Sequence, residues 1–536
     1  MKKDLFSLKE GLNRRQFLQL SANAGLLMAV TSETAFADGH DELVVAIPAD
    51  TGGWDQDYLA FDLVGLALFK NCYPYMINYG VKASGSSLVM DTDSIIPVFA
   101  ESWESDAAGQ VWTLKIRKGI SFPSGNPLTA HDVKWSKDRA FAAQANVAGI
   151  YRMIGLTESD QVEVVDDYTV RFTQSQPSSL SSHIQVICLY VFDSEELKNH
   201  ATTDDPWAIE WTTKNPQHGG AYNVASYNPG QEIVLEANPN YPLDQPRVKR
   251  VRLQVVPSAA NRRLLLEKGE VDIGIGLSRR DIDDLRDKSG ISVISSPSNE
   301  WVFMPMSATV PPLDNPKVRQ ALAHAVPYDA IIDNVFNGNA RRSTSPVPLD
   351  MPGHSSGGYP FQYDLDKARA LLAETGHENG FEVEIVIMAG DVEQERMAVI
   401  VGSSFKEIGV TLNISALDPG TLFQRRTEKS IPLQIASGQM WVNDIEYLLA
   451  TSLTPGGFLN YAGYDNARVQ EIFLELNSLA DDSARAVLFE ELQGILANDV
   501  PWLVLAQPNF DLPVSSRVSN WVQPVDGLFR LEYLSM

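Results

Sequence analysis

The sequence predicts an α/β fold made of more than one domain. The chain has 536 residues, more than a single hydrophobic core usually serves. Hydrophobic residues make up 44% and charged residues 21% of the chain, which is typical of globular proteins. Segments with the apolar period of strands alternate with segments that have the period of helices, and this alternation favours layers of sheet and helix.

The first half of the chain is predicted to be rich in strands. Residues 43–48 have the composition of a buried strand, and residues 111–116 alternate apolar and polar side chains. A turn rich in glycine and proline follows, and Thr129 with Asp132 then gives a helix-start signal that resembles a capping box. Further strands are expected at 161–172 and 221–241, each as a hairpin, and at 184–192, 248–256 and 271–276.

The second half is predicted to alternate helices and strands after a compositional break near 295–298. A helix is expected to open at Pro316, capped by Asp314 or Asn315. Residues 341–363 carry several prolines, glycines and serines and are expected to form a loop. Other helices are expected at 261–268, 365–374, 394–408 and 467–498, with a strand at 381–388.

The formal net charge of −25 limits the partners of the protein. An acidic surface repels phosphate backbones and anionic lipid headgroups, so we expect no nucleic-acid partner and no binding to a membrane surface. After residue 37, no apolar run reaches the ~18 residues of a membrane helix. We therefore expect an unanchored chain.

Residues 1–37 are predicted to be a secretory signal peptide. Basic residues precede an apolar stretch at 18–30, and a small-x-small pattern ends at Ala37, where cleavage is expected. The pair Arg14 and Arg15 resembles the export signal of the twin-arginine pathway. An ordinary secretory signal with two chance arginines is the alternative.

The two cysteines, Cys72 and Cys188, form no metal or redox motif. A disulfide is possible in an oxidising compartment, but two buried thiols are the simpler expectation. The sequence alone leaves that choice open.

Motifs of catalysis are weak. Residues 353–357 match the G-x-S-x-G pattern, which needs a strand before the serine and a helix after it, but prolines flank the segment on both sides. Gly274 and Gly276 lack the third glycine of a dinucleotide site. We expect no catalytic residues, no cofactor and no metal, although carboxylate pairs assembled in space remain possible.

Several segments, in order along nearly the whole chain from residue 97, resemble the signature of a known family. They are 97–104, 112–122, 125–133, 228–236, 238–241, 269–273, 311–315, 318–322 and 499–502. The family is that of the extracellular solute-binding proteins of family 5, which includes the dipeptide-, oligopeptide- and nickel-binding proteins of ABC transporters. Each match alone is weak, but the ordered set is specific.

The resemblance implies a two-lobed periplasmic binding protein fold of type II, of the large cluster that has an extra subdomain. Lobe I would cover 38–298, with the subdomain at about 76–214, and lobe II would cover 299–504. Residues 505–536 would return to lobe I, so that two crossover segments form the hinge. The solute would be trapped between the closing lobes.

The resemblance also implies a ligand site in the second half of the chain. Trp441 and Asp444 are similar to the Trp-x-x-Asp of peptide binders, in which the aspartate pairs with the α-ammonium group of the peptide. A helix-capping Asp444 beside a core tryptophan is the alternative. Tyr447 and Arg426 are further candidates, the arginine for a solute carboxylate.

Two more candidate regions come from the first lobe and the crossover. Trp54 and Asp55 follow the first strand, at the place of the family's ligand-facing loop, but that loop usually contains Leu-Asp-Pro. Trp301 follows the expected crossover and would line either the cleft or the core. Because Glu446 and Tyr447 stand where the family often has Asp-Pro, the solute itself is not predicted.

The implied function is that of the periplasmic binding component of an ABC importer. It would carry peptides or a similar amine-bearing solute to a membrane permease and act as a monomer. An exported enzyme and a ligand sensor on the same fold are the alternatives.

Overall fold

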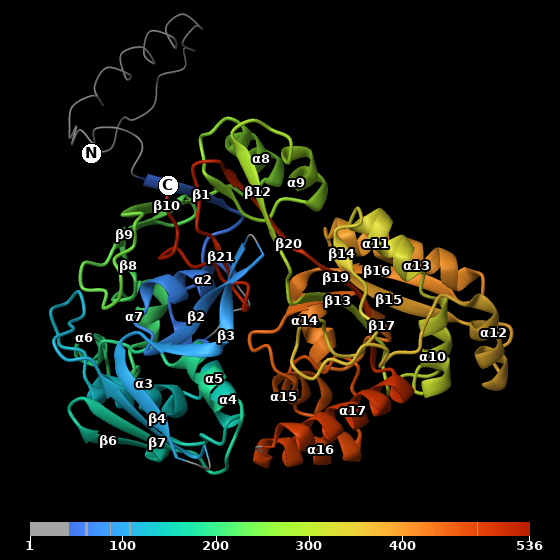
Figure 1. Cartoon of the computed structure of the whole chain (residues 1–536), viewed down its shortest axis with the longest axis horizontal. Helices are drawn as coiled ribbons and strands as arrows, with labels where there is room; N and C mark the ends of the chain where they lie inside the picture. The colour runs from blue at the N-terminus through green and yellow to red at the C-terminus, as the bar shows by residue number, and fades with distance from the viewer. Residues whose placement is uncertain (1–41, 59–62, 86, 107–108, 480) are drawn as a thin grey trace, which may run out of the picture. The chain divides into compact units, whose positions relative to one another are not determined.

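A computed structural model describes residues 42–536, apart from 59–62, 86, 107–108 and 480 (Figure 1). The expected signal peptide, with Arg14, Arg15 and the cleavage site at Ala37, lies outside the described residues. Strands and helices alternate along the described chain, as the sequence predicts.

The largest sheet has seven strands in the order β12-β20-β11-β1-β10-β9-β8. Strand β1 lies inside it and pairs in parallel with β10 on one side and β11 on the other, which explains its mostly buried side chains. Helices α8 and α9 pack on β11, β12 and β20 (Figure 1). The bounds are β1 Glu42–Ile47, β8 Tyr222–Asn228, β9 Glu232–Ala237, β10 Arg250–Val255, β11 Ile273–Gly274, β12 Ile291–Ser296, β20 Phe510–Ser515, α8 Ala259–Glu267 and α9 Arg279–Leu285.

A second group of elements comes from the segment between β1 and β8. It contains the four-stranded antiparallel sheet β4-β5-β7-β6, on which α3 packs, and the pair β2-β3, to which the C-terminal segment adds β21 as a third strand. The bounds of the strands are β2 Ile77–Ser84, β3 Ser87–Pro97, β4 Ala100–Ser105, β5 Val111–Ile116, β6 Val162–Asp166, β7 Thr169–Thr173 and β21 Val522–Gln523. Those of the helices are the 3-10 turns Gln56–Tyr58 and Ser159–Gln161, α2 Leu63–Cys72, α3 Ala130–Ala142, α4 Asn146–Arg152, α5 Ser181–Cys188, α6 Ser194–His200 and α7 Ile209–Lys214.

The remaining sheets belong to the chain between residues 300 and 508. One has the order β14-β19-β13-β18, and the other, β16-β15-β17, is parallel. The bounds of the strands are β13 Glu300–Pro305, β14 Ala340–Arg341, β15 Glu382–Met388, β16 Thr411–Leu417, β17 Leu433–Gln434, β18 Ala436–Gln439 and β19 Trp502–Pro508. Those of the helices are α10 Pro316–Ala325, α11 Tyr328–Val335, α12 Leu365–Glu374, α13 Val392–Lys406, α14 Pro419–Thr427, α15 Ile445–Leu448, the π-helix Leu449–Leu453, α16 Ala467–Ser478 and α17 Asp482–Asp499.

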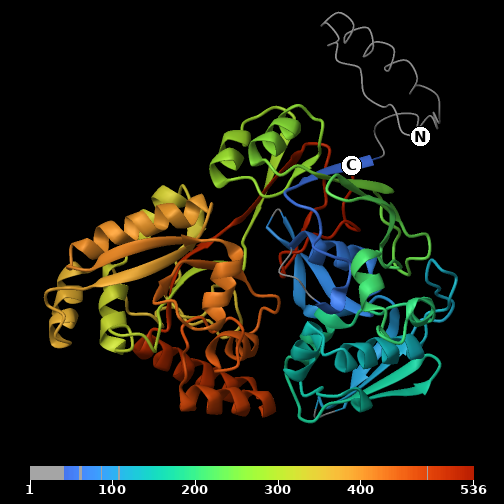
Figure 2. The same cartoon turned by 180° about the vertical axis from the view of Figure 1, so that it is seen from behind.

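The chain passes twice between the seven-stranded sheet and the β13–β19 sheet. It does so between β12 and β13, and again between β19 and β20. Strand β19 continues to Pro508, past the expected boundary between the lobes at 504/505. The second passage therefore comes at Asn509. Helices α16 and α17 lie side by side in both views (Figures 1 and 2).

Local signals in the sequence match the observed helix starts. Asn315 caps α10, since its Oδ1 accepts a hydrogen bond from the Lys317 amide at 3.0 Å, and Pro316 opens the helix. At the start of α3 the Asp132 carboxylate accepts from the Thr129 amide at 2.9 Å. The strand β5 and helix α3 therefore form the predicted strand–turn–helix.

Three expectations about the elements need correction. Residues 184–192 were expected as a strand, but most of them belong to α5, since an apolar run also suits a helix that is buried all round. The helix expected at 467–498 is divided into α16 and α17, and Asp481 caps the second by accepting from the Ala484 amide. The strand expected at 271–276 is shortened to β11.

The structure shows a packing role for the two cysteines and for the G-x-S-x-G segment. Cys72 and Cys188 are both buried free thiols, and burial raises the pKa of each. Residues 353–357 lie in a loop, which confirms that the pattern is no hydrolase elbow. Gly353 has φ +85°, and a Cβ there would lie 2.7 Å from the Phe489 ring.

Candidate functional site

Asp55 and its neighbour Trp54 lie in the interior next to β1. Both carboxylate oxygens of Asp55 accept hydrogen bonds from the protein: Oδ2 from Arg139 at 2.5 Å and from Thr212 at 2.5 Å, and Oδ1 from Arg139 at 3.1 Å. Trp54 is 2% exposed and packs edge-on against Tyr227. These contacts favour a structural role for this pair.

Arg139 of α3 is shared between Asp55 and Asp57. Its side chain is fully buried, and Asp57 also accepts from the Tyr190 hydroxyl at 2.7 Å. Burial acts to lower the pKa of Arg139, but the charges of Asp57 and Asp55 outweigh it and raise that pKa. The cluster is thus a buried, well-satisfied ion pair that ties α3 to the segment after β1.

Trp301 and Arg426 are joined by a stack of aromatic rings. Trp301 is 1% exposed and stacks on Phe303, with ring centroids 4.1 Å apart. Phe303 lies parallel to Tyr461 at 6.4 Å, and the Arg426 guanidinium lies 4.3 Å above the Tyr461 ring. Arg426 also donates to the Gln434 side chain at 3.3 Å, so two of the predicted residues belong to one packed column.

The segment from Trp441 to Tyr447 carries the other predicted residues. Trp441 and Asp444 are half-buried, whereas Tyr447 is buried in the core. Asp444 caps α15, because its Oδ1 accepts a hydrogen bond from the Glu446 amide at 2.7 Å. Capping leaves the carboxylate at a partly accessible helix start, so the capping alternative does not exclude a solute contact.

Glu446 is a residue of this segment that the sequence-based candidates omit. Its side chain is fully buried, and its Oε1 accepts hydrogen bonds from Arg485 of α17 and, at 3.0 Å, from Ser179 just before α5. Burial, followed by the neighbouring Asp444, raises the pKa of Glu446 to about 8, although Arg485 acts in the opposite direction. The sequence contains one hint at this residue. Glu446 and Tyr447 stand where the family often has Asp-Pro, so an acidic side chain occurs two residues after Asp444.

Residues of the first half of the chain face this acidic segment. Besides Ser179, they include His183 of α5, whose Nδ1 lies 2.8 Å from the Tyr79 hydroxyl of β2. Burial lowers the pKa of His183, and Glu446 counteracts part of that effect. Elements from both parts of the chain therefore meet at Asp444 and Glu446, which makes this the candidate functional site.

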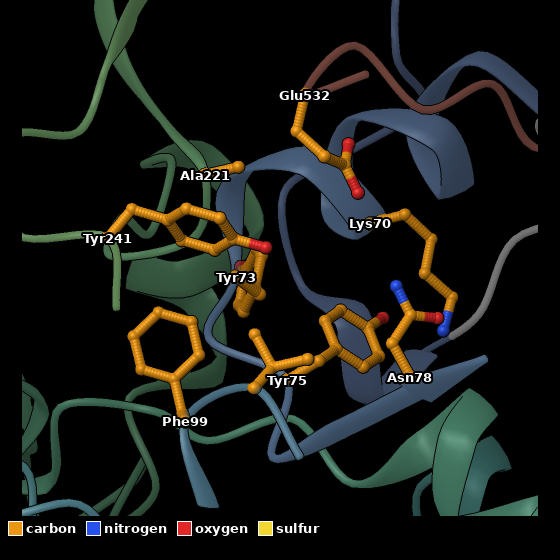
Figure 3. Close-up of a pocket in the computed structure, with 9 residues that line it drawn as sticks. Lys70, Tyr73, Tyr75, Asn78, Phe99, Ala221, Tyr241 and Glu532 are labelled. Carbon is orange, nitrogen blue, oxygen red and sulfur yellow. The ribbon is translucent and has the colours of Figure 1, made fainter. Parts of the chain in front are cut away.

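A separate small cavity lies between α2, the start of β2 and the C-terminal segment (Figure 3). Its volume is about 20 Å³, which suits a single water molecule. Lys70 at its edge donates to the carbonyls of Val186 and Ile187, at 3.0 Å each. Burial lowers the pKa of Lys70 to about 7. The cavity is too small to hold a peptide or a sugar.

The described residues offer neither a metal site nor a membrane-spanning helix. In the part of the chain that the structure describes, no group of three or more His, Cys, Asp or Glu side chains is placed to hold a metal ion. Within residues 42–536, outside the gaps given above, no helix is long and apolar enough to cross a membrane.

The sheets, and the two passages of the chain between them, define a two-lobed α/β fold. Residues 94–460 match the family model described as "Bacterial extracellular solute-binding proteins, family 5 Middle". The chain belongs to this family, as the sequence motifs indicated. Its members are binding proteins that work outside the cytoplasm.

Individual relatives are similar in sequence to this chain over most of its length. The chain is 23% identical over 517 residues to the probable D,D-dipeptide-binding periplasmic protein DdpA of Escherichia coli (strain K12), covering 92% of this chain and 95% of that protein. It is 26% identical over 454 residues to heme-binding protein A of Haemophilus influenzae, covering 81% and 82%.

A solved structure has the same two-lobed fold. It is that of the ABC transporter-associated periplasmic binding protein DppA from Helicobacter pylori, in complex with the peptide STSA. The TM-score is 0.79 at 22% sequence identity, and the match covers 92% of this chain and 98% of the other. The two-lobed α/β architecture predicted from the sequence is thereby confirmed.

Proposed function

We propose that this solute-binding protein is the capture component of an ABC importer, and that its solute is a peptide or another small molecule with a cationic amine. Asp444 receives the amine, Trp441 packs against the solute, and the loaded protein docks on a membrane permease. The protein itself does no chemistry, and it acts as a monomer.

The half-buried carboxylate of Asp444 carries this proposal. Its Oδ1 is held by the Glu446 amide at 2.7 Å, so the side chain has a fixed direction at the start of α15. Such a carboxylate, enclosed further when two lobes close, needs a cation, and an ammonium group supplies one with charge-assisted hydrogen bonds. Asp55, by contrast, already has its cation in Arg139.

The solute is captured when the two lobes close and is released when they open. We infer that lobe I consists of residues 42–298 with 509–536 and that lobe II consists of 299–508, with the hinge at the two passages of the chain. Contacts that a solute makes with both lobes are what favour the closed form. The contact between Ser179 and Glu446, at 3.0 Å, is of the kind that closure would form.

Export by the twin-arginine route, with cleavage near Ala37, completes the proposal. Replacement of Arg14 and Arg15 by lysine should block export by that route and leave the precursor in the cytoplasm. Cell fractionation of the two forms tests this step, and an unchanged periplasmic yield would contradict it.

Native mass spectrometry of the protein, purified from the periplasm of producing cells, tests the solute class. We expect bound masses that are released on denaturation and that belong to peptides or other amines. A released solute without a cationic group would contradict the proposal for Asp444. Size-exclusion chromatography with light scattering checks the monomer.

A further inference from the structure

Asp444 and Glu446 stand two residues apart at the start of α15, and Glu446 has a buried carboxyl oxygen without a partner among the described residues. Glu446 is 0% exposed, and its Oε2 meets no hydrogen-bond donor among the described residues. The Asp444 carboxylate is held close by, since its Oδ1 accepts a hydrogen bond from the Glu446 amide at 2.7 Å, and its charge raises the pKa of Glu446. Because ionised carboxylates only accept hydrogen bonds, Asp444 can satisfy Oε2 only through a proton or a cation between them.

The neighbouring charges leave this pair short of one positive charge. Arg485 provides a single guanidinium for two carboxyl groups, and it also donates to the carbonyls of Leu476 and Leu479, at 3.1 and 3.2 Å. On the other side, burial lowers the pKa of His183, so that this imidazole is neutral at pH 7. One charge of the pair therefore remains uncompensated.

The remaining groups that face the pair are polar but neutral at pH 7. Ser179 donates to Oε1 of Glu446 at 3.0 Å. The Tyr79 hydroxyl contacts His183, and burial raises the pKa of Tyr79, an effect to which Asp444 adds. Neither group supplies the missing charge.

We propose that Asp444 and Glu446 together form a two-carboxylate site for one cationic group of the solute, in which a shared proton takes the place of that group while the site is empty. This inference rests on the proposed function and adds a second acid to it. When an amine arrives at Asp444, the proton on Glu446 leaves to solvent, and the ammonium group becomes the counter-ion in its place. Glu446 thus makes binding of the solute depend on pH.

Titration of the empty protein tests the shared proton directly. We would label the glutamates with ¹³C and follow the infrared band of their protonated carboxyl groups against pH. One labelled group should titrate near pH 8 and vanish in Glu446→Gln. In Asp444→Asn, which keeps the helix cap, its midpoint should fall by about one pH unit, because a like charge is removed.

Glu395→Gln is the matched control. Glu395 also lies in the first turn of a helix, α13, but it is exposed. This substitution should leave the band that titrates near pH 8 unchanged. The proposal is overturned if that band is absent from the unsubstituted protein, if it survives Glu446→Gln, or if its midpoint ignores Asp444→Asn.

Calorimetry then separates this inference from the proposed function. The probe is a pool of tryptic peptides of casein, with the same pool acetylated at its amino groups as the neutral comparison. Heats measured in phosphate and in Tris at pH 7 should show release of up to about one proton per bound peptide, and none in Glu446→Gln. Binding of peptides without proton release overturns the inference. Failure of both pools to bind counts against peptides as the solute. In that case the infrared titration alone shows whether Glu446 holds a proton in the empty protein.

Discussion

Two acidic clusters of the molecule each contain two carboxyl groups and one arginine, and they differ in how the carboxyl oxygens are satisfied. In the Asp55–Asp57 cluster, Arg139, Thr212 and Tyr190 donate to the carboxylates. In the Asp444–Glu446 pair, Oε2 of Glu446 is buried and meets no donor among the described residues. The two clusters thus differ in their hydrogen-bond donors and not in the number of their charges, and this difference is the basis of the proposed solute site.

Removal of Arg139 should damage the structural cluster severely. Arg139→Leu leaves Asp55 and Asp57 buried without their cation, and we expect it to lower the free energy of unfolding by about 3–5 kcal/mol. Urea unfolding followed by tryptophan fluorescence measures this loss. Arg171→Leu is the control, because its ion pair with Glu163 is largely exposed and should contribute at most about 1 kcal/mol. Equal losses in the two variants would contradict the contrast.

The pH dependence of stability should reveal the second cluster. The pKa of Glu446 is raised to about 8, so the folded protein holds a proton that the unfolded chain loses above about pH 4.5. This contribution is complete below about pH 4.5 and is lost as pH rises through 8, and it should amount to about 5 kcal/mol. Thermal unfolding from pH 5 to 9 should therefore show a decline in the unsubstituted protein that Glu446→Gln flattens. A parallel decline in the two proteins would argue against a proton on Glu446.

Two substitutions of Asp444 separate its capping role from its charge. Asn is as good a cap as Asp, so Asp444→Asn should keep the stability at pH 5, whereas Asp444→Ala should lose about 1 kcal/mol. Both variants remove the carboxylate and should weaken solute binding alike. Equal stability of the Ala and Asn variants would show that the hydrogen bond to the Glu446 amide contributes little.

The sequence predicted the local structure better than the site. Helix α12 begins and ends where its pattern predicted, and Pro316 and Asn315 marked the start of α10, because caps and periods are local signals. The apolar run at 184–192 was wrongly expected as a strand, since its burial in α5 depends on distant neighbours.

The partners of the acidic residues lie far away in sequence. Asp55 and Arg139 are 84 residues apart, and Glu446 lies 267 residues from Ser179. No pattern along the chain shows that Asp55 has a cation or that Oε2 of Glu446 lacks a donor. The resemblance to the family pointed to both Asp444 and Asp55, and only the packed structure shows that Asp55 is paired with the buried Arg139.

The most direct measurement compares the affinities of Asp444→Asn and Asp55→Asn for the solute that co-purifies with the protein. Both variants are first checked for folding by circular dichroism, and binding is then measured by isothermal titration calorimetry at pH 7. We expect Asp444→Asn to bind at least about tenfold more weakly than the unsubstituted protein. Asp55→Asn should bind with nearly unchanged affinity. Loss of binding in Asp55→Asn together with full binding in Asp444→Asn would contradict the assignment of the solute site to Asp444.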